Sequence, residues 1–516
     1  MAANKSNPFM TPKRWKAARK LVQYAALLGF IALFLASRRG GWATELVNAP
    51  LRLDPLGMLA NLIASRALLT GSALALIILA LTVVFGRAWC GWLCPLGTVL
   101  DIASPQRKIQ PIFKEPARLR SVKYGLLFTT LVAAVFTNLT LLVFDPLTIL
   151  LRTLTVAIWP AIDRIISAGE SALYPVALLQ DPIDAFDKLV RPALLPESPL
   201  YYRDAALFAA FFVGLIALNW IAPRFWCRYL CPLGGLLGLV SKISLVRRVV
   251  VASECTGCDA CARMCPTGTI QFGKNGASDP SECTMCLECL RACPRGGETF
   301  KPVIALAKLQ PYDPTRRQVL ASIGAAAVGA GILNSEMAAR RDDPYLVRPP
   351  GARENNLGSK CIRCGECMRA CPTGALQPAL FEAGLEGVWT PIVLPRLGYC
   401  DYSCNACGQV CPVQAIPPLN LDDKRVTPIG KAYIDTTRCI AWADHRDCIV
   451  CEEMCPLPEK AIKLDETQVR NADGEMVTVK LPMVNRDRCI GCGICQYKCP
   501  QSQMGIRVFT LGASPF

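Results

Sequence analysis

Long apolar stretches, separated by polar connections, dominate the first half of the chain. They run over Leu21–Ala36, Leu68–Phe85, Tyr124–Phe144 and Ala205–Ile221. A helix of about 20 residues crosses a hydrocarbon layer of about 30 Å. We therefore predict four membrane-spanning helices, with the buried helices of a soluble protein as the alternative.

The charged residues that flank these stretches predict their orientation. Lysines and arginines cluster before the first stretch, between the second and third, and after the fourth, whereas the connection 145–204 is rich in aspartate and glutamate. In membrane proteins the cytoplasmic loops carry the excess of basic residues. We therefore place the N-terminus inside the cell and the connection 145–204 outside it.

A repeated motif follows the second and the fourth stretch. RAWCGWLCPLGTVL at 87–100 matches RFWCRYLCPLGGLL at 224–237, including both cysteines and the proline. Both copies end a helix that runs from outside to inside, so the repeat is parallel, with its axis along the membrane normal. Each cysteine pair is spaced i, i+4, which places both thiols on one helix face. We expect the axis to bring the two pairs together at the inner membrane boundary.

The second half of the chain is rich in cysteine, proline and glycine, and its apolar runs are short. Domains with so small a core are held together by the metal groups that they bind. Between two such regions lies the segment 315–333, TRRQVLASIGAAAVGAGIL. Its twin arginines and weakly apolar stretch are typical of a twin-arginine export signal, with a linker helix as the alternative.

These features predict a multidomain protein, an α-helical membrane bundle of four spans with α+β ferredoxin-like [4Fe–4S] domains. The expected parts are a membrane domain at 1–248, an inner two-cluster ferredoxin domain at 249–312, a signal anchor at 313–341 that adds a fifth span, and an exported four-cluster domain at 342–516.

Two cysteine runs predict the clusters of the inner domain. In the bacterial ferredoxin run C-x2-C-x2-C-x3-C-P, the first three thiolates hold one cluster and the fourth ligates the neighbouring cluster. We predict one [4Fe–4S] cluster on Cys255, Cys258, Cys261 and Cys293, and a second on Cys283, Cys286, Cys289 and Cys265. Zinc ribbons use two C-x-x-C knuckles instead of such triplets.

Four more runs of the same kind follow the export-like segment. They are Cys361, Cys364, Cys367, Cys371; Cys400, Cys404, Cys407, Cys411; Cys439, Cys448, Cys451, Cys455; and Cys489, Cys492, Cys495, Cys499. Each ends in Cys-Pro, so we predict four further clusters rather than disulfides. The pairing stays open: first with fourth and second with third, or each run with its neighbour.

The cysteines of the membrane repeat are Cys90, Cys94, Cys227 and Cys231. Four thiolates at one boundary suit a seventh [4Fe–4S] cluster, a redox-active dithiol or copper(I). Buried free cysteines that pack as small apolar side chains are the alternative. We predict that the four jointly bind a redox centre and favour a seventh cluster.

The composition excludes several other classes of redox protein. The chain has 28 cysteines but one histidine, His445. Haem b needs axial histidine pairs, haem c needs C-x-x-C-H, and a Rieske centre needs two histidines. The formal net charge of +16 follows the positive-inside rule, so we expect no nucleic acid partner.

On these motifs the chain resembles the ferredoxin-type proteins of periplasmic nitrate reduction. Residues 1–300 resemble the four-span protein NapH in the C-x3-C-P motifs at 90–95 and 227–232 and in the runs at 255–294. Residues 315–516 resemble its exported partner NapG in the twin arginines and in the runs from Cys361 to Pro500. The whole chain therefore resembles a NapH–NapG fusion.

The resemblance implies a quinol dehydrogenase in the bacterial inner membrane, as part of a membrane complex. Membrane quinol would be oxidised in or beside the bundle, and electrons would leave through the C-terminal clusters to a periplasmic cytochrome or another redox subunit. Such clusters carry electrons and supply no acid–base group, so we name no catalytic residue and no quinone site. The rival hypothesis is an electron donor for the maturation or repair of a periplasmic metalloenzyme.

Overall fold

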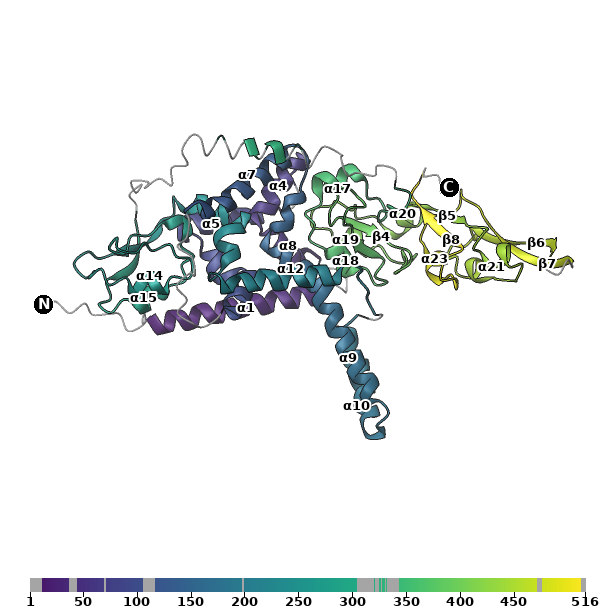
Figure 1. Ribbon diagram of the computed structural model, residues 1–516, viewed down its shortest axis with the longest axis horizontal. Coiled ribbons are helices and arrows are strands. Elements are labelled where there is room, and N and C mark those ends of the chain that lie inside the picture. The colour runs from purple at the N-terminus through teal and green to yellow at the C-terminus, as the bar shows by residue number, and fades with distance from the viewer. Residues whose placement is uncertain are drawn as a thin grey trace. The chain divides into compact units, whose positions relative to one another are not determined.

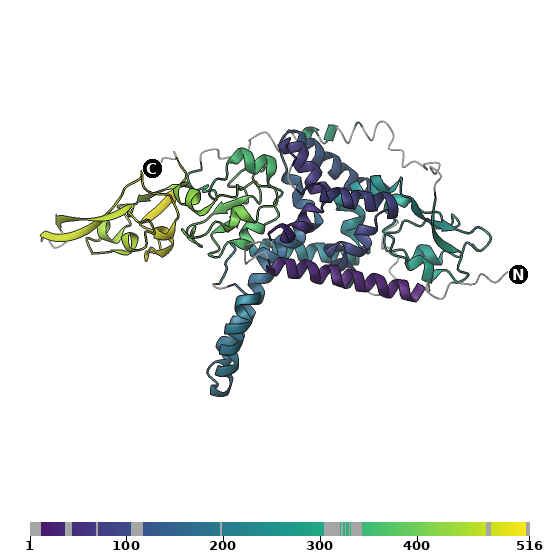
Figure 2. The same cartoon turned by 180° about the vertical axis from the view of Figure 1, so that it is seen from behind.

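The computed structural model describes residues 12–36, 44–68, 71–104, 117–196, 199–303, 343–470 and 476–511, with isolated positions between 320 and 331. The chain separates into two compact units (Figures 1 and 2). One comprises Met1–Ala36, Glu45–Thr153 and Leu207–Asn334, and the other Ser37–Thr44, Leu154–Ala206 and Ser335–Phe516. The predicted signal anchor with its twin arginines lies outside the described residues, apart from the isolated positions.

Helices form most of the first unit. They include α1 (Pro12–Ala36), α4 (Pro55–Ser65), α5 (Leu74–Phe85), α6 (Pro95–Ala103), α7 (Val122–Val135), α8 (Pro146–Thr153), α12 (Ala205–Ala217) and α13 (Pro232–Ser241). Helix α13 packs against α4, α5 and α7. Leu56, Leu127 and Leu237 are almost fully buried between these helices. Prolines open α4, α6 and α13, where the first helical position needs no N–H donor.

The predicted membrane spans differ in length from the helices that the structure has at these positions. In the described part of the chain, one helical stretch, Lys13–Ala36, is long and apolar enough to cross a membrane by itself. Helix α5 begins only at Leu74, and the third stretch breaks after α7 into a short 3-10 turn at Thr140–Phe144. The apolar windows include turn residues at which the helices stop, so four spans stay a prediction.

A small α+β domain completes the first unit. Strand β1 (Val246–Val250) pairs antiparallel with β2 (Glu298–Pro302), and between them lie α14 (Ala260–Met264) and α15 (Glu288–Ala292). The two short helices pack against each other. Ala262, Ile270 and Cys289 form the small buried core of the domain.

The second unit carries the remaining cysteine runs. Its paired strands are β3 (Leu376–Pro378) with β4 (Pro391–Val393), β5 (Lys431–Ile434) with β8 (Ile506–Phe509), and β6 (Ile462–Arg470) with β7 (Met476–Val484), all antiparallel. Short helices such as α18 (Glu366–Ala370) and α23 (Ile494–Lys498) lie within the cysteine runs. Helices α9 (Trp159–Leu173) and α10 (Ala177–Leu189) form an arm of this unit (Figure 1).

The connection that precedes α12 packs against the C-terminal cysteine domain inside this second unit. The guanidinium carbon of Arg369 lies 3.6 Å from the centroid of the Trp159 ring. The Tyr202 hydroxyl donates a 3.1 Å hydrogen bond to the Met368 carbonyl, and Arg203 forms an ion pair with Glu382. The chain segment between the third and fourth apolar stretches therefore holds the C-terminal domain directly.

Candidate iron–sulfur cluster sites

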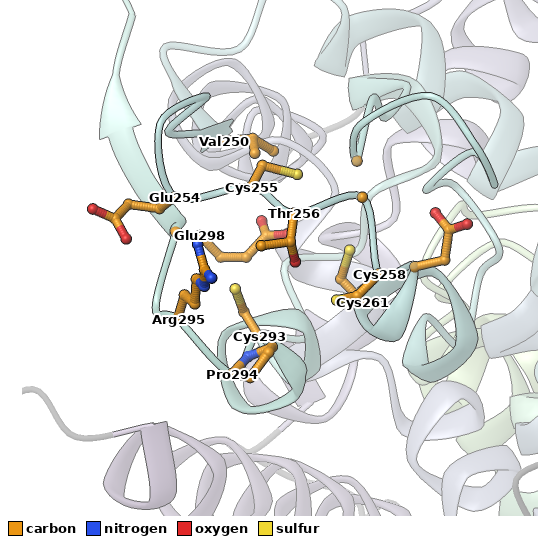
Figure 3. Close-up of a pocket in the computed structure, with 14 residues that line it drawn as sticks. Val250, Glu254, Cys255, Thr256, Cys258, Cys261, Cys293, Pro294, Arg295 and Glu298 are labelled. Atoms are coloured by element: carbon orange, nitrogen blue, oxygen red, sulfur yellow. The ribbon is translucent and has the colours of Figure 1, made fainter.

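Four thiols of the inner domain surround one cavity (Figure 3). Cys255, Cys258, Cys261 and Cys293 all line it. The first three come from the loop and first turn that lead into α14, and the fourth lies at the end of α15. This is the set predicted for the first cluster, three thiols from one run and the last from the other.

The second inner set also combines the two runs. Burial raises the pKa of Cys286 to about 11, and the neighbouring Cys265 thiol raises it as well. Burial raises the pKa of Cys283 to about 12, and Cys286 and Cys265 contribute in the same direction. Cys289 lies beside Cys286 and Cys283. Cys265, the last cysteine of the first inner run, therefore lies with the thiols of the second inner run, as the sequence predicts.

The first two C-terminal runs exchange their last cysteines with each other. Burial raises the pKa of Cys364 and Cys367, and Cys411 is among the neighbouring thiols that raise it further. In the reverse direction, Cys371 lies beside the thiols of the second run, Cys400, Cys404 and Cys407.

The third and fourth C-terminal runs are paired in the same way. Burial raises the pKa of Cys451 to about 12, with the Cys499 thiol as the next cause. Cys439 also lies beside Cys448 and Cys499. Conversely, one pocket is lined by Cys455, Cys489, Cys492 and Cys495. The structure thus has neighbouring runs paired, which is the second of the two schemes that the sequence left open.

A direct contact joins the two C-terminal pairs. The Cys400 backbone N–H donates a 2.8 Å hydrogen bond to the Cys492 carbonyl. Beside it, the rings of Tyr399 and Tyr497 lie 5.4 Å apart between centroids. The second and the fourth run therefore touch, and the four C-terminal sites form one connected series.

Each membrane cysteine pair is built on a π-turn. The turns are Trp89–Leu93 and Trp226–Leu230, and the N–H groups of Cys94 and Cys231 close them by bonding the carbonyls of Trp89 and Trp226. Cys94 and Cys231 themselves are extended, because each precedes a proline that disfavours helical backbone. The expectation that each pair lies on one α-helical face is therefore wrong in detail. Single π-turns in helices occur frequently at functional sites.

The four membrane thiols nevertheless come together. Burial raises the pKa of Cys94, and Cys90 and Cys227 raise it further. Burial likewise raises the pKa of Cys231, again with Cys227 and Cys90 as neighbours. All four side chains are at least nine-tenths buried. The repeat axis thus juxtaposes the pairs, as the motif predicts.

An arginine from each repeat crosses to the other copy. The Arg224 guanidinium donates to the Cys90 carbonyl at 3.0 Å, and the Arg87 guanidinium to the Cys227 carbonyl at 3.4 Å. Both side chains are about 1% exposed. Arg224 also binds Asp101 through two hydrogen bonds of 2.6 Å. Two buried positive charges therefore flank the four thiols, where they would offset the negative charge of bound thiolates.

The inner ferredoxin domain rests on the same place. Glu282, next to Cys283, accepts hydrogen bonds of 2.5 and 2.6 Å from Lys123 and forms a 3.2 Å ion pair with Arg87. The Trp92 indole donates to the Met285 carbonyl at 2.9 Å. A β-carbon on Gly91 would lie 2.0 Å from the Thr284 carbonyl oxygen, so this approach requires glycine. The second inner site therefore adjoins the membrane cysteines.

The donor sets fit [4Fe–4S] clusters. Each set has four thiols on short turns, and such a cluster, when bound, supplies one-electron transfer. No three histidine, cysteine, aspartate or glutamate side chains converge on a single ion position within the described residues. A cubane does not require that convergence, because each thiolate ligates a different iron. His445 lies in the loop before Cys448 with a φ of +51°.

Comparisons with known proteins agree with this chemistry. Two family models, each described as a 4Fe-4S binding domain, match residues 67–112 and 205–250 and residues 358–377 and 482–502. A third, a 4Fe-4S dicluster domain, matches residues 254–296. No solved structure matches.

Curated relatives decide the family. The ferredoxin-type protein NapG of Escherichia coli is 36% identical over 195 residues, which are 36% of this chain and 80% of the relative. The methylamine utilization ferredoxin-type protein MauM of Methylobacillus flagellatus is 32% identical over 201 residues, 37% of this chain and 80% of the relative. The chain belongs to the NapG/MauM family of ferredoxin-type proteins.

The NapG/MauM matches cover little more than a third of the chain. A further relative, the ferredoxin-type protein MauN of Methylorubrum extorquens, is 31% identical over 261 residues, 49% of this chain and 75% of the relative. The chain is thus a ferredoxin-type iron–sulfur electron-transfer protein with multiple 4Fe-4S domains.

Sequence reasoning missed the residues that surround the thiols. Arg87 and Arg224 occupy equivalent positions of the repeat, and the presence of arginine in both copies could have indicated their role. Glu282 had no such signal, because its partners Lys123 and Arg87 lie far away in the sequence.

Proposed function

We propose that the chain is a membrane-bound quinol dehydrogenase module that delivers electrons to a periplasmic redox protein. The observation that carries this proposal is the packing of the connection 154–206 on the C-terminal cysteine domain, through Trp159, Tyr202 and Arg203. Under the four-span topology this connection lies outside. The four C-terminal sites are then fastened to the outer membrane surface, where a membrane quinol and a periplasmic acceptor can both reach them.

The proposal assigns the cysteines as follows. The six ferredoxin-type sets, 24 cysteines in all, hold six [4Fe–4S] clusters, and Cys90, Cys94, Cys227 and Cys231 hold a seventh. The geometry supports this assignment, because each set of four thiols is drawn together. The match of a 4Fe-4S binding domain to residues 67–112 and 205–250, which contain the membrane cysteines, supports the seventh.

The architecture is that of a NapH–NapG fusion in the bacterial inner membrane. Helices at all four apolar stretches support it, with α1 as a span and α5, α7 and α12 as shorter ones. The inner ferredoxin domain packs at the C-x3-C-P end of the bundle, next to Lys123 at the start of α7. The segment 313–341 would return the chain to the outside as a signal anchor.

Quinol-dependent reduction tests the proposal. The full chain in lipid nanodiscs is mixed anaerobically with a naphthoquinol or benzoquinol, and loss of the visible cluster absorbance is followed. We expect reduction of the C-terminal sites within seconds and transfer onward to a periplasmic cytochrome. Failure of every quinol, with full reduction by dithionite, would contradict the proposal.

The rival role as an electron donor for maturation predicts a different pattern. Transfer to the client would stop after its metal site is complete, and a strain without this chain would accumulate an under-metallated periplasmic enzyme. Sustained quinol turnover with many acceptor equivalents per chain distinguishes the quinol dehydrogenase from this rival.

A further inference from the structure

A cavity of about 480 Å³ lies in the second unit, apart from the cysteine sets. Its walls come from Tyr201 to Arg203, from Leu394 to Leu397, and from the single residues Tyr345, Gln496 and Val508. Sites for small organic molecules have volumes of roughly 300–1,000 Å³ and combine apolar walls with a few polar groups. This cavity has the size and the lining of such a site.

The cavity lies where a membrane-soluble molecule would reach it. Tyr201, Tyr202 and Arg203 are followed at once by α12, the fourth predicted span, which begins at Ala205. Tyrosine and arginine are common at the level of the lipid headgroups. Their backbone is fixed, because Gln377 accepts a hydrogen bond from the Arg203 N–H and donates one to the Tyr201 carbonyl. Part of the cavity wall is therefore joined through the chain to the outer end of a predicted span.

Two candidate cluster sites adjoin the cavity. Val508 lines both the cavity and the pocket that contains Cys455, Cys489, Cys492 and Cys495. On another wall, the Tyr202 hydroxyl bonds the carbonyl of Met368, which follows Cys367. One residue thus separates the cavity from a cysteine set on each of two sides.

We propose that this cavity binds the headgroup of a quinol, with its ring between Pro395 and Val508 and its hydroxyls toward Tyr201 and Arg396. The inference rests on the proposed quinol dehydrogenase function. Oxidation of one quinol to the quinone releases two protons and two electrons. The protons would leave to solvent through the open mouth, and the two electrons would pass one at a time to the oxidised [4Fe–4S] clusters that the two adjoining cysteine sets would hold.

The polar groups of the site suit this ligand. Tyr201 is 59% exposed, and the guanidinium carbon of Arg164 lies 4.4 Å from the centroid of its ring. Arg396 is exposed and has no hydrogen-bond or ion-pair partner within the described residues. A protein acceptor would need a contact surface of roughly 800 Å² instead of a cavity of this size. The occupant we infer is therefore a planar, apolar-tailed quinol.

Two variants of the full chain in nanodiscs test the site. Leu397→Trp fills the cavity, and Arg396→Gln removes the free donor; Arg353→Gln, at an exposed arginine in a different cavity, is the matched control. The probes are a short-chain naphthoquinone for equilibrium binding by calorimetry and its quinol for cluster reduction. We expect Leu397→Trp to weaken binding at least tenfold and Arg396→Gln about fivefold, with KM for the quinol rising in parallel.

The results of these experiments distinguish an error in the cavity assignment from an error in the proposed quinol dehydrogenase function. Iron content and dithionite-reduced EPR spectra should be unchanged in all three variants, which excludes damage to the clusters. Normal binding and normal KM in both cavity variants, with quinol oxidation intact, would overturn the cavity assignment and leave the proposed function standing. A wild-type chain that neither binds the quinone nor oxidises the quinol would overturn both.

Discussion

The inner ferredoxin domain and the C-terminal cysteine domain hold similar thiol sets in different surroundings. The inner domain is fastened to the helices by buried charge: Glu282 is 4% exposed, Lys123 0% and Arg87 1%. Within the described part of the C-terminal domain, each ion pair has at least one exposed side chain, and in the pair of Lys480 with Glu466 both are exposed. The inner cysteine sets therefore depend on the helices, whereas the C-terminal sets are held by their own turns and by the packing of neighbouring runs.

Solvent access differs as well. Cys258 of the first inner set is exposed, whereas none of the sixteen C-terminal cysteines is. The first inner set is therefore open to solvent, whereas the second adjoins Cys90, Cys94, Cys227 and Cys231. The shielded outer series instead continues from run to run through the contact of Cys400 with Cys492.

The largest expected effect is the loss of a whole cluster when the last cysteine of a run is replaced. Cys265→Ser in the inner domain and Cys371→Ser in the outer domain should each remove the cluster of the neighbouring run, because the last thiol lies there. Iron analysis should show four atoms fewer per chain, and Mössbauer and EPR spectra should assign the loss. Damage to the cluster of the run that contains the replaced cysteine would refute the exchange.

The next effect concerns the buried ion pairs. Glu282→Gln should lower the free energy of unfolding by about 3–5 kcal/mol, because Lys123 and Arg87 lose their buried counter-charge. Denaturant unfolding followed by tryptophan fluorescence measures this. Glu466→Gln, the matched change at an exposed pair, should cost less than about 0.5 kcal/mol. Equal decreases in the free energy of unfolding in the two variants would show that the inner domain does not depend more on its ion pairs than the C-terminal domain does.

The same pair makes a prediction about pH. Burial opposes ionisation of Glu282, but Lys123 and Arg87 outweigh it and hold the pKa of the carboxyl below its usual range. A lowered folded-state pKa stabilises the protein above the unfolded-state value of about 4.3, and this contribution is lost as the pH falls through the folded-state value. The stability difference between wild type and Glu282→Gln should therefore be constant from about pH 5 to 7 and shrink below about pH 4. Burial lowers the pKa of Lys123 to about 8, so the comparison is made below pH 7. A difference that does not shrink below pH 4 would contradict this prediction.

A smaller effect is expected on the potential of the membrane centre. Reduction adds negative charge, so removing the buried cation in Arg224→Gln should lower the midpoint potential by on the order of 50–100 mV. EPR-monitored titration measures it. Lys424→Gln is the matched change at a buried cation beside Cys400 in the C-terminal domain, and it should shift the potential of its centre in the same direction. An unchanged potential in Arg224→Gln would mean that this arginine only anchors the turn.

The smallest effect is expected from Lys480→Gln on the long hairpin of β6 and β7. Its 3.9 Å ion pair with Glu466 is exposed on both sides, so we expect a change below about 0.5 kcal/mol and no shift in any cluster potential. A loss of 2 kcal/mol or more would show that the outer domain also relies on its charges.

Sequence patterns predicted the local ligand sets better than their tertiary partners. The run C-x3-C-P was enough to expect Cys293 beside Cys255, because the exchange of the last thiol is built into a two-cluster fold. The pairing of the C-terminal runs was not predictable, because it depends on which turns pack together. It became visible only where Cys411 meets Cys364 and Cys499 meets Cys451.

In the helical region the sequence likewise predicted which residues meet but not the detailed backbone around them. The repeat predicted that Cys90, Cys94, Cys227 and Cys231 meet, but not the π-turns, because i, i+4 spacing alone does not distinguish an α-turn from a π-turn before proline. Hydropathy located the helices but underestimated the first, which begins at Pro12, and overestimated the second and third. Their ends depend on turn residues such as Gly71 and Thr137, whose φ values are positive.

The iron and acid-labile sulfide content of the anaerobically purified full chain measures directly whether its 28 cysteines bind seven clusters. We expect 28 iron and 28 sulfide per chain, falling to 24 of each in Cys94→Ser while the other six clusters keep their spectra. A wild-type content of 24 would show that Cys90, Cys94, Cys227 and Cys231 bind no cluster. A content of 16 or fewer irons, with zinc in the remaining sites, would refute the cluster assignment as a whole.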